Sequence, residues 1–330
     1  MLLWIPVTAV IQNGRNNYSA KKMKTLYKKI SSHDIIKLLS TPSYLYFAFS
    51  VLFSQIAFNM LNVVLIFLVF YLTSSNFAVS LLVLTILIPQ IFLSFLGGVV
   101  ADAKNKKSIL VYGNFFRALV LVILFFNTHS IFIVYFTALI IAVITQFYVP
   151  AEAPLIPYLA KKQYLVAANS IFGIGLFGSI LVGYVFAGPV ITLLGRSVVF
   201  LVISAIFLFA TFFAALIPYK MPKKKTEDFH NVSEVNKSIR GEFSASYRLL
   251  KNTGGAASAF LLLIFSQVIV LILATLVPGY AKTILQVPAE DLSILLFAPA
   301  ALGMIVAAFF MGSIFHKFNK QTLMTIGVFI

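Results

Sequence analysis

Long apolar segments separated by short polar ones run along almost the whole chain. Windows of spanning length fall at about 43–72, 77–100, 108–127, 130–149, 168–193, 197–217, 257–279 and 291–315, and a ninth begins near 322. A transmembrane helix needs about 20 such residues. Because lipid offers the backbone no hydrogen-bond partner and the windows show no alternating pattern, we expect every span to be α-helical.

Composition also indicates a membrane protein. Apolar residues make up 61% of the chain and charged residues 10%, which is too little charge to cover a soluble domain of 330 residues. The absence of cysteine excludes disulfides and thiolate metal sites. The four histidines are scattered, and the sequence has neither paired intramembrane carboxylates nor a Walker A loop. We therefore expect no metal, no cofactor, and neither enzymatic nor ATP-driven activity.

The basic residues predict the topology. If the N-terminus is cytoplasmic, 22 of the 25 Lys and Arg residues fall on the cytoplasmic side, as the positive-inside rule predicts. They lie in the N-terminal segment (1–42), in the 2–3, 4–5 and 8–9 loops, and in a hydrophilic stretch at 218–256. The net charge of +16 is then a topology signal, so nucleic acid is not an expected partner. We predict a multi-pass protein of the cytoplasmic membrane.

The same pattern divides the apolar part of the chain in two. A bundle of six transmembrane spans (43–217) precedes an incomplete bundle (257–330) that holds two spans and the start of a third. In the stretch between them, 218–256, apolar residues recur every three or four positions. We expect an amphipathic helix there, along the inner membrane surface, with either a tethering or a regulatory role.

Two loops with a similar layout occupy equivalent places. "GVVADAKNK" (98–106) follows the second span, and "GSIFHKFNK" (312–320) follows the eighth, which is the second span of the second half. Both have Gly first, a polar residue four positions later, and Asn-Lys at the same offset. The recurrence predicts two repeated halves, as in many transporters.

The first loop resembles the inner 2–3 loop of the major facilitator superfamily, which reads G-x-[LV]-[AGS]-D-[RK]-x-G-[RK]-[RK]. Gly98, Asp102, Lys106 and Lys107 match in register, and Asn105 stands where Gly is usual. Asn tolerates a left-handed turn, so we expect the turn to survive. The resemblance implies a conformational latch, in which Gly98 admits a neighbouring helix and Asp102 caps a helix of the other half. An ordinary tight basic turn is the alternative.

Two further segments are similar to one branch of that superfamily. "FYVPAEAPLIPYLAKKQYLVAANS" (147–170) and residues 275–312 resemble the 4–5 connection and spans 7 and 8 of drug:proton antiporters and of macrolide- or siderophore-exporter-like members. The resemblance implies ion-coupled export of an amphiphilic small molecule by alternating access, by a protein that is monomeric when full length. Because the family fold has twelve spans, the chain is expected to be C-terminally truncated.

Two other functions stay open. A lipid or lysolipid flippase of the same fold is the runner-up, because few polar groups are present to recognise a hydrophilic solute. A non-transporting membrane scaffold is the other alternative, which a test for substrate-dependent flux would separate from a carrier.

Polar residues inside spans are costly unless they face a cavity or one another, so each is a functional candidate. Gln55, Asn59 and Asn62 lie at i, i+4 and i+7 of the first span, on one helical face. They are predicted to line a substrate cavity, with interhelical hydrogen bonding as the alternative. Gln146 and Gln267 are weaker candidates for the same cavity.

Charged residues are rare near the spans. Arg117 lies about nine residues, ~14 Å, into its helix, so we expect it to pair with Asp102 or Glu152 or to snorkel to the surface. Asp102 and Glu152 are the only titratable carboxylates that come near the membrane interior. Proton coupling is therefore implied by the resemblance and is assigned to no residue.

Small residues recur at four-residue steps in the fifth span, at Gly175, Ser179 and Gly183, and Gly188-Pro189 follows. Such a stripe predicts close helix packing, with a bend at the proline. Antiporters of the superfamily have a Gly-rich motif with a Gly-Pro pair here. Gly188 and Pro189 match this pair, but the neighbouring glycines of the motif are not in register.

Overall fold

The computed structural model describes residues 32–219, 256–300 and 302–303. Within these ranges, seven helices are long and apolar enough to span a membrane. They are α4 (Pro42–Thr73), α5 (Asn76–Ala103), α6 (Lys106–Phe126), α7 (Ile131–Glu152), α9 (Leu165–Leu194), α10 (Val198–Leu216) and α12 (Ala256–Tyr280). Two short helices, α3 (Ser32–Leu39) and α8 (Ile156–Leu159), complete the set used below.

The seven long helices begin and end within three residues of the predicted spans. Local signals explain several ends. The Ser75 side chain accepts a hydrogen bond from the Ala78 amide and caps α5, and Asn105 caps α6 in the same way. The eighth predicted span is described only as far as residue 303, and it begins with a π-helical turn, Ser293–Phe297. The ninth span, the linker helix and the second loop lie outside the described residues.

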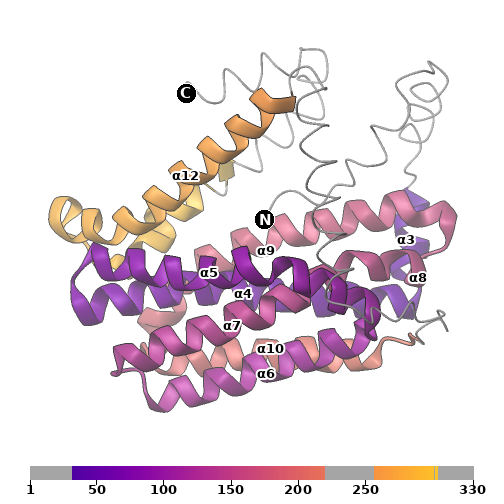
Figure 1. Ribbon diagram of the computed structural model, residues 1–330, viewed down its shortest axis with the longest axis horizontal. Coiled ribbons are helices and arrows are strands. Elements are labelled where there is room, and N and C mark those ends of the chain that lie inside the picture. Colours follow the sequence, from indigo (N-terminus) through magenta and orange to yellow (C-terminus); the bar gives the residue numbers. More distant parts are fainter. Residues whose placement is uncertain (1–31, 220–255, 301, 304–330) are drawn as a thin grey trace, which may run out of the picture.

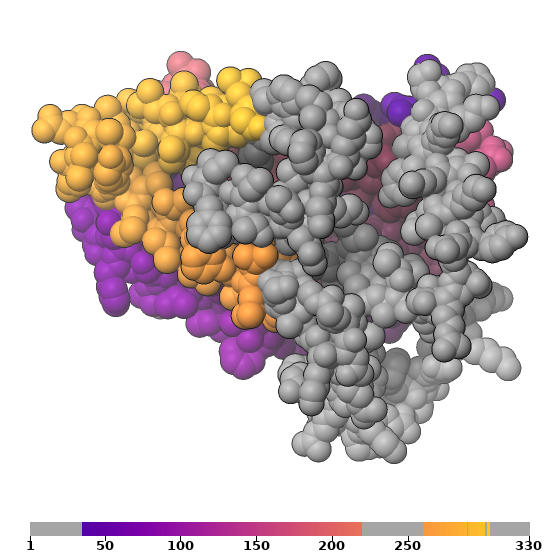
Figure 2. Space-filling model, turned by 90° about the horizontal axis from the view of Figure 1, so that it is seen from above, coloured from indigo at the N-terminus to yellow at the C-terminus, as the bar shows by residue number. Residues whose placement is uncertain are grey.

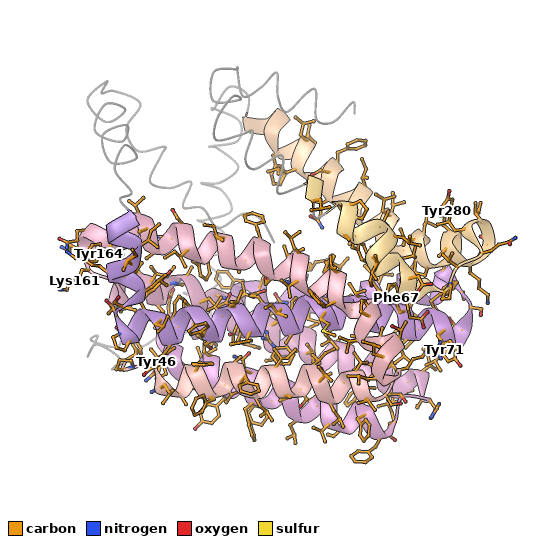
Figure 3. All side chains as sticks on the ribbon, turned by 180° about the vertical axis from the view of Figure 1, so that it is seen from behind. Tyr46, Phe67, Tyr71, Lys161, Tyr164 and Tyr280 are labelled. Carbon is orange, nitrogen blue, oxygen red and sulfur yellow. The ribbon has the colours of Figure 1, made fainter. Side chains whose placement is uncertain are left out.

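The six helices α4 to α10 run antiparallel and form one bundle with two distinct ends (Figure 1). We call the end that holds Lys104, Lys161 and Lys162 the basic end, and the end that holds Ser74 and Arg196 the distal end. Figure 3 shows Lys161 at the basic end and Tyr71 at the distal end. Of the long helices, α4 is the most buried, and it contacts α5, α7, α9 and α10.

Two apolar cores fill the bundle, one toward each end. On α4 the basic-end core reaches Val51, and the distal-end core starts at Ala57. On α6 the corresponding limits are Leu110 and Ala118. Polar side chains occupy the gap between the two cores. The bundle therefore has a polar level inside it, where an apolar core would cost less free energy.

The helix α12 is attached mainly at the distal end. Figure 1 shows it leaning away from the six-helix bundle, with its later residues close to that end. Seen from above, the atoms of α12 and of the segment after it cover the purple helices at one side (Figure 2). Helix α12 contacts α5 and α4, and most of its side chains from Phe260 to Leu276 are exposed.

Candidate functional site

A cluster of polar side chains lies between the two apolar cores and reaches into the basic-end core, to which its member Tyr148 belongs. We call it the polar cluster, and its members come from α4, α6 and α7. Each is less than a tenth exposed. The members are Ser54, Gln55, Asn114, Arg117, Thr145, Tyr148 and Glu152.

Arg117 is the centre of the cluster and is 1% exposed. Its Nη2 donates to Thr145 Oγ1 at 2.9 Å, and its Nη1 donates to Ser54 Oγ and Asn114 Oδ1, both at 3.4 Å. Its Cζ lies 4.2 Å from the centre of the Tyr148 ring. The guanidinium is therefore held by neutral donors, acceptors and an aromatic face.

The predicted ion pair of Arg117 is not formed. Among the described residues, no carboxylate oxygen lies within 4.0 Å of the guanidinium. Snorkelling is excluded too, because the side chain is buried. Its Nε has no hydrogen-bond partner among the described residues. The expectation was wrong because the hydroxyls of Ser54 on α4 and Thr145 on α7, and the amide of Asn114 on α6, accept the hydrogen bonds that a carboxylate would otherwise accept.

Glu152 is the second buried charge, 2% exposed. The Gln55 Nε2 donates to both of its carboxylate oxygens, at 3.2 Å each. Within the part of the chain that the structure describes, no Lys, Arg or His nitrogen lies within 4.0 Å of it. An ionised carboxylate in such a place accepts hydrogen bonds from one amide, which only partly offset its desolvation.

The predicted face of α4 is divided between two partners. Gln55 bonds to Glu152 on α7, and the Asn59 Nδ2 donates to Ser179 Oγ on α9 at 3.3 Å. Asn62 is half-buried. The interhelical alternative thus accounts for the contacts of Gln55 and Asn59 in this conformation.

The two weaker cavity candidates lie apart from the polar cluster. Gln146 donates to the Ala142 carbonyl of its own helix, and Gln267 is exposed on α12. The structure therefore does not bring these two side chains to the α4 face.

Small residues of α9 make a close contact with α4. A Cβ at Gly183 would lie 2.8 Å from the Met60 amide nitrogen of α4. Ser179 is fully buried, whereas a Cβ at Gly175 would meet nothing within 4 Å among the described residues. Helix α9 continues through Pro189 to Leu194, so the expected bend at this proline does not end the helix.

The predicted latch loop lies at the basic end. The Asp102 side chain is 79% exposed, and its Oδ1 lies 3.8 Å from the Lys106 Nζ. Lys106 also donates to the Ala101 carbonyl at 2.7 Å. The Lys107 amide donates to Asn105 Oδ1 at 3.0 Å. Asn105 has φ −65°, so the expected left-handed turn is wrong, because the residue serves as the helix cap instead.

The close approach expected at Gly98 occurs one residue earlier. A Cβ at Gly97 would collide with the Gln146 carbonyl of α7, whereas one at Gly98 would meet nothing within 4 Å among the described residues. The partner helix expected for Asp102 lies outside the described residues. The latch therefore stays a prediction.

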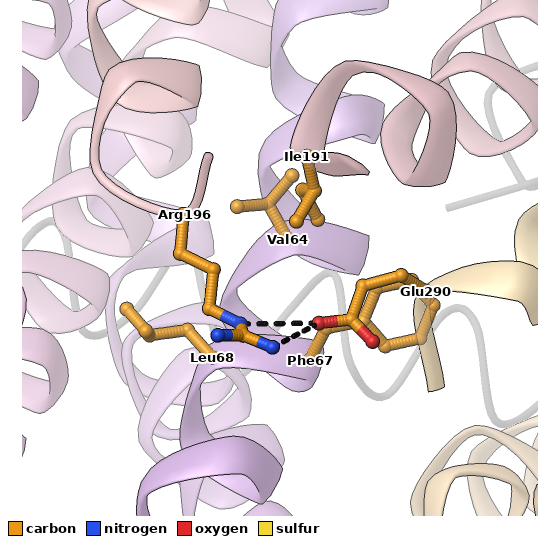
Figure 4. A pocket seen from close by; sticks show the side chains of 6 residues that line it. All are labelled: Val64, Phe67, Leu68, Ile191, Arg196 and Glu290. Atoms are coloured by element: carbon orange, nitrogen blue, oxygen red, sulfur yellow. Dashed lines mark hydrogen bonds and ion pairs between the residues drawn. The ribbon is translucent and has the colours of Figure 1, made fainter. Parts of the chain in front are cut away.

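An ion pair at the distal end joins the connection between α9 and α10 to the segment that follows α12 (Figure 4). The Arg196 Nε and Nη2 donate to Glu290 Oε1 at 3.1 and 3.0 Å. The Arg196 Cζ also lies 3.5 Å from the centre of the Tyr71 ring. Four apolar side chains line the same pocket as the pair, those of Val64, Phe67, Leu68 and Ile191. Sequence reasoning missed this pair.

Two further contacts reinforce the distal end. The Gly188 amide donates to Ser293 Oγ at 2.9 Å, and a Cβ at Gly188 would collide with the Glu290 carbonyl. The Lys282 Nζ donates to Ser74 Oγ at 2.8 Å. Gly188 is thus a contact point between α9 and the segment that follows α12, in addition to any role in packing α9.

A comparison with family models gives a match to the Major Facilitator Superfamily over residues 47–330. The chain belongs to the major facilitator superfamily. The all-helical fold class is thereby confirmed, and so is a multi-pass membrane protein that transports small molecules and is not an enzyme. A comparison with curated proteins gives no significant match. In this superfamily member the polar cluster and the distal ion pair are the candidate functional features.

Weakening the distal ion pair is expected to open that end. The chain has no cysteine, so Leu68→Cys provides a unique label in the same pocket as the pair. Adding Arg196→Gln should raise its rate of reaction with a water-soluble maleimide about fivefold, since a partly exposed pair contributes up to ~1 kcal/mol. The swap Arg196→Glu with Glu290→Arg should restore slow labelling. If Arg196→Gln leaves the rate unchanged, the pair does not hold this end closed.

Proposed function

We propose that this superfamily member exports an amphiphilic small molecule, of the drug, macrolide or siderophore kind, in exchange for protons. The proposal places the N-terminus and the basic end in the cytoplasm, and it takes the functional protein to be a monomer. The distal contact between Arg196 and Glu290 is then the extracellular closure, and the conformation is inward-facing. The latch assigned to Gly98, Asp102, Lys106 and Lys107 would act at the opposite, cytoplasmic end.

The observation that supports coupling is the buried Glu152 carboxylate. Arg117 on α6 and Tyr148 on its own helix are the titratable groups that face it, and Gln55 faces it from α4. Ionising Glu152 makes the cluster neutral overall, whereas protonating it leaves the positive charge of Arg117 alone in an apolar interior. The two states are costly in different ways, which suits a group that binds and releases a proton.

Gln55 would link the protonation state of Glu152 to substrate binding. It lies one turn from Asn59, on the α4 face predicted to line the cavity. An amide that donates to an ionised carboxylate is held more strongly than one beside a neutral acid. Proton loss from Glu152 would therefore fix Gln55 in the position observed, and proton uptake would release it toward a substrate.

The test is transport in proteoliposomes with a fluorescent amphiphilic cation. Glu152→Gln should abolish accumulation driven by a pH gradient and should retain exchange of labelled for unlabelled substrate, since exchange needs no proton. Asp291→Asn is the matched control outside the cluster, with the same loss of charge. If Glu152→Gln still accumulates substrate along a pH gradient, Glu152 is not the coupling group. No flux in the unchanged protein would favour the scaffold instead.

A flippase of the same fold is the second candidate. An apolar cavity at the basic end, lined by aromatic residues of α4 and α9, favours a substrate with a hydrocarbon chain. Flux of a fluorescent lysolipid, with no flux of the amphiphilic cation, would support the flippase and contradict drug export.

A further inference from the structure

A cavity of about 290 Å³ lies at the basic end between α3, α4 and α9. Its walls are almost wholly apolar. The residues are Leu39, Tyr44, Leu45, Phe47, Ala48, Phe49, Val51, Leu52, Ile171, Phe172 and Gly175. The hydroxyl of Tyr44 donates to the Ala168 carbonyl at 2.7 Å, so the only polar side chain of the wall is already engaged. Such a wall offers a ligand only dispersion contacts and burial from water, which suits hydrocarbon.

The depth of the cavity matches that of a lipid chain. Helix α4 starts at Pro42, and the deepest α4 residue of the wall, Leu52, lies about 15 Å further along. One leaflet of the hydrocarbon core is about 15 Å thick, half of the ~30 Å of a bilayer. With Pro42 at the membrane surface, the cavity would extend from that surface through the level of the acyl chains.

Helix α3 lies at the entrance to this cavity. Its Leu39 forms part of the wall, and its Leu38 is buried in the basic-end core. Ile36 and Lys37 are exposed. A short helix with a buried apolar side and an exposed Lys is typical of a helix in the membrane interface. The entrance of the cavity thus lies where α3 packs on α4 and α9, and we expect this place to be at the membrane surface.

Positive charge gathers beside the same entrance. Lys37 on α3 and Lys161 and Lys162 before α9 are all exposed, and α3 contacts the turn Lys162–Tyr164 directly. Lys161 lies at this end of the molecule in Figure 3. In the described residues, no Asp or Glu oxygen lies within 4.0 Å of these three ammonium groups. They are therefore available to an anionic group at headgroup level.

We propose that this cavity binds one acyl chain of an anionic phospholipid from the surrounding bilayer, with the headgroup held by Lys37, Lys161 and Lys162. The wall determines that the buried part is hydrocarbon, and the three ammonium groups select a negative headgroup. The inference does not depend on drug export or on proton coupling. Its test measures lipid contact and not transport, so its failure is distinct from failure of the proposed function.

The experiment uses quenching of tryptophan fluorescence by brominated lipid chains, which requires contact. The only Trp of the chain is Trp4, so Trp4→Phe with Phe172→Trp leaves one reporter in the cavity wall. The protein is placed in nanodiscs that contain about a tenth of brominated phosphatidylglycerol or brominated phosphatidylcholine. The anionic lipid should quench the reporter well above its share of the bilayer, and the zwitterionic lipid should not.

Two matched variants sharpen the result. Each Lys→Gln change at positions 37, 161 and 162 should lower the preference for the anionic lipid, by about fivefold for a Lys near the surface. Gly175→Leu should fill the cavity and abolish quenching, whereas Gly175→Ala should retain it. A Cβ at Gly175 meets nothing within 4 Å among the described residues, so Gly175→Ala should not disturb folding, and the further carbons of Leu would extend into the cavity that Gly175 lines.

A reporter on the outside of the bundle provides the control. Phe209 on α10 is 60% exposed, and Phe209→Trp should be quenched equally by both lipids and be insensitive to the three lysines. Equal quenching of the position-172 reporter by the two lipids would overturn the proposal. So would a reporter that neither lipid quenches, because protein would then cover the cavity.

Discussion

Gly183→Leu is expected to prevent assembly of the six-helix bundle. The Cβ of any other residue would lie 2.8 Å from both the Met60 amide nitrogen and the Asn59 Cβ, and a backbone atom cannot rotate away. Overpacking of a tight core costs about 1–3 kcal/mol, and a leucine adds three more carbons at the same point. Because α4 is the most buried span, separation of α4 from α9 exposes its polar residues to lipid. Loss of monodisperse protein in fluorescence-detected size exclusion would reveal the effect.

A neighbouring glycine on the same helix supplies the control. A Cβ at Gly178 meets nothing within 4 Å among the described residues. Gly178→Ala should be neutral or stabilising, since Ala is favoured over Gly in a helix by about 1 kcal/mol. Gly183→Ala should destabilise despite the same gain in helix propensity. Equal melting temperatures of the two Ala variants would contradict the close approach of α9 to α4.

Arg117→Ala is expected to lower stability strongly and to abolish transport. It removes three hydrogen bonds, which in membrane proteins average about 0.6 kcal/mol each. It also removes a desolvated contact with the Tyr148 ring, worth about 2 kcal/mol, and leaves a cavity. Relief of the buried positive charge acts in the opposite direction. Because the packing terms are larger here, we expect a net loss, measurable as a lower melting temperature in detergent.

Arg117→Met separates packing from charge. Methionine fills much of the same space without a charge, so stability should be closer to that of the unchanged protein. It leaves Glu152 without its nearest positive group, so adding Glu152→Gln should raise the melting temperature further. Neither variant should transport. If the two changes are simply additive in stability, the two buried charges do not interact, and the coupling proposed for Glu152 loses its counter-charge.

Helix positions were predictable because burial in lipid requires long apolar runs, and these are visible residue by residue. The exact ends were not. Helix α7 extends to Glu152, past the predicted end at 149, because the buried carboxylate finds Gln55 within the bundle. Helix α3 was not foreseen, since eight residues with mixed polarity do not differ from an ordinary cytoplasmic segment.

The polar cluster was only half predictable. Gln55, Arg117 and Glu152 are conspicuous in apolar runs. Tyr148 and Thr145 are ordinary residues of apolar spans. Tyr148 does lie four positions before Glu152, which places it one turn earlier on the same helical face. The position of the close glycine, Gly97 instead of Gly98, depends on the rotation of α5 against α7. That rotation is determined by packing between the helices, and the local sequence does not reveal it.

The distal ion pair was beyond sequence reasoning for a different reason. Arg196 and Glu290 are 94 positions apart, and both lie in short connections outside the spans. Arg196 lies in a loop that is predicted to be on the outer side, where a positive residue is a weak exception to the charge rule and gives no hint of its partner. Pairs between the two halves depend on how the halves dock, and this docking is a property of the assembled molecule.

Because α12 is attached to the bundle mainly at one end, a small rotation there would move its other end through a larger distance. Its 25 residues extend for about 37 Å. The attachment lies where Lys282 binds Ser74 and Arg196 binds Glu290. A tilt of α12 by about 10° around this attachment would move the N-terminal end of the helix by about 6 Å, more than one helical turn of 5.4 Å. The distal contacts themselves would shift by only a fraction of that distance. The distal hydrogen bonds could thus remain intact while the distance between α12 and the bundle changes, toward the basic end, by the width of a small ligand.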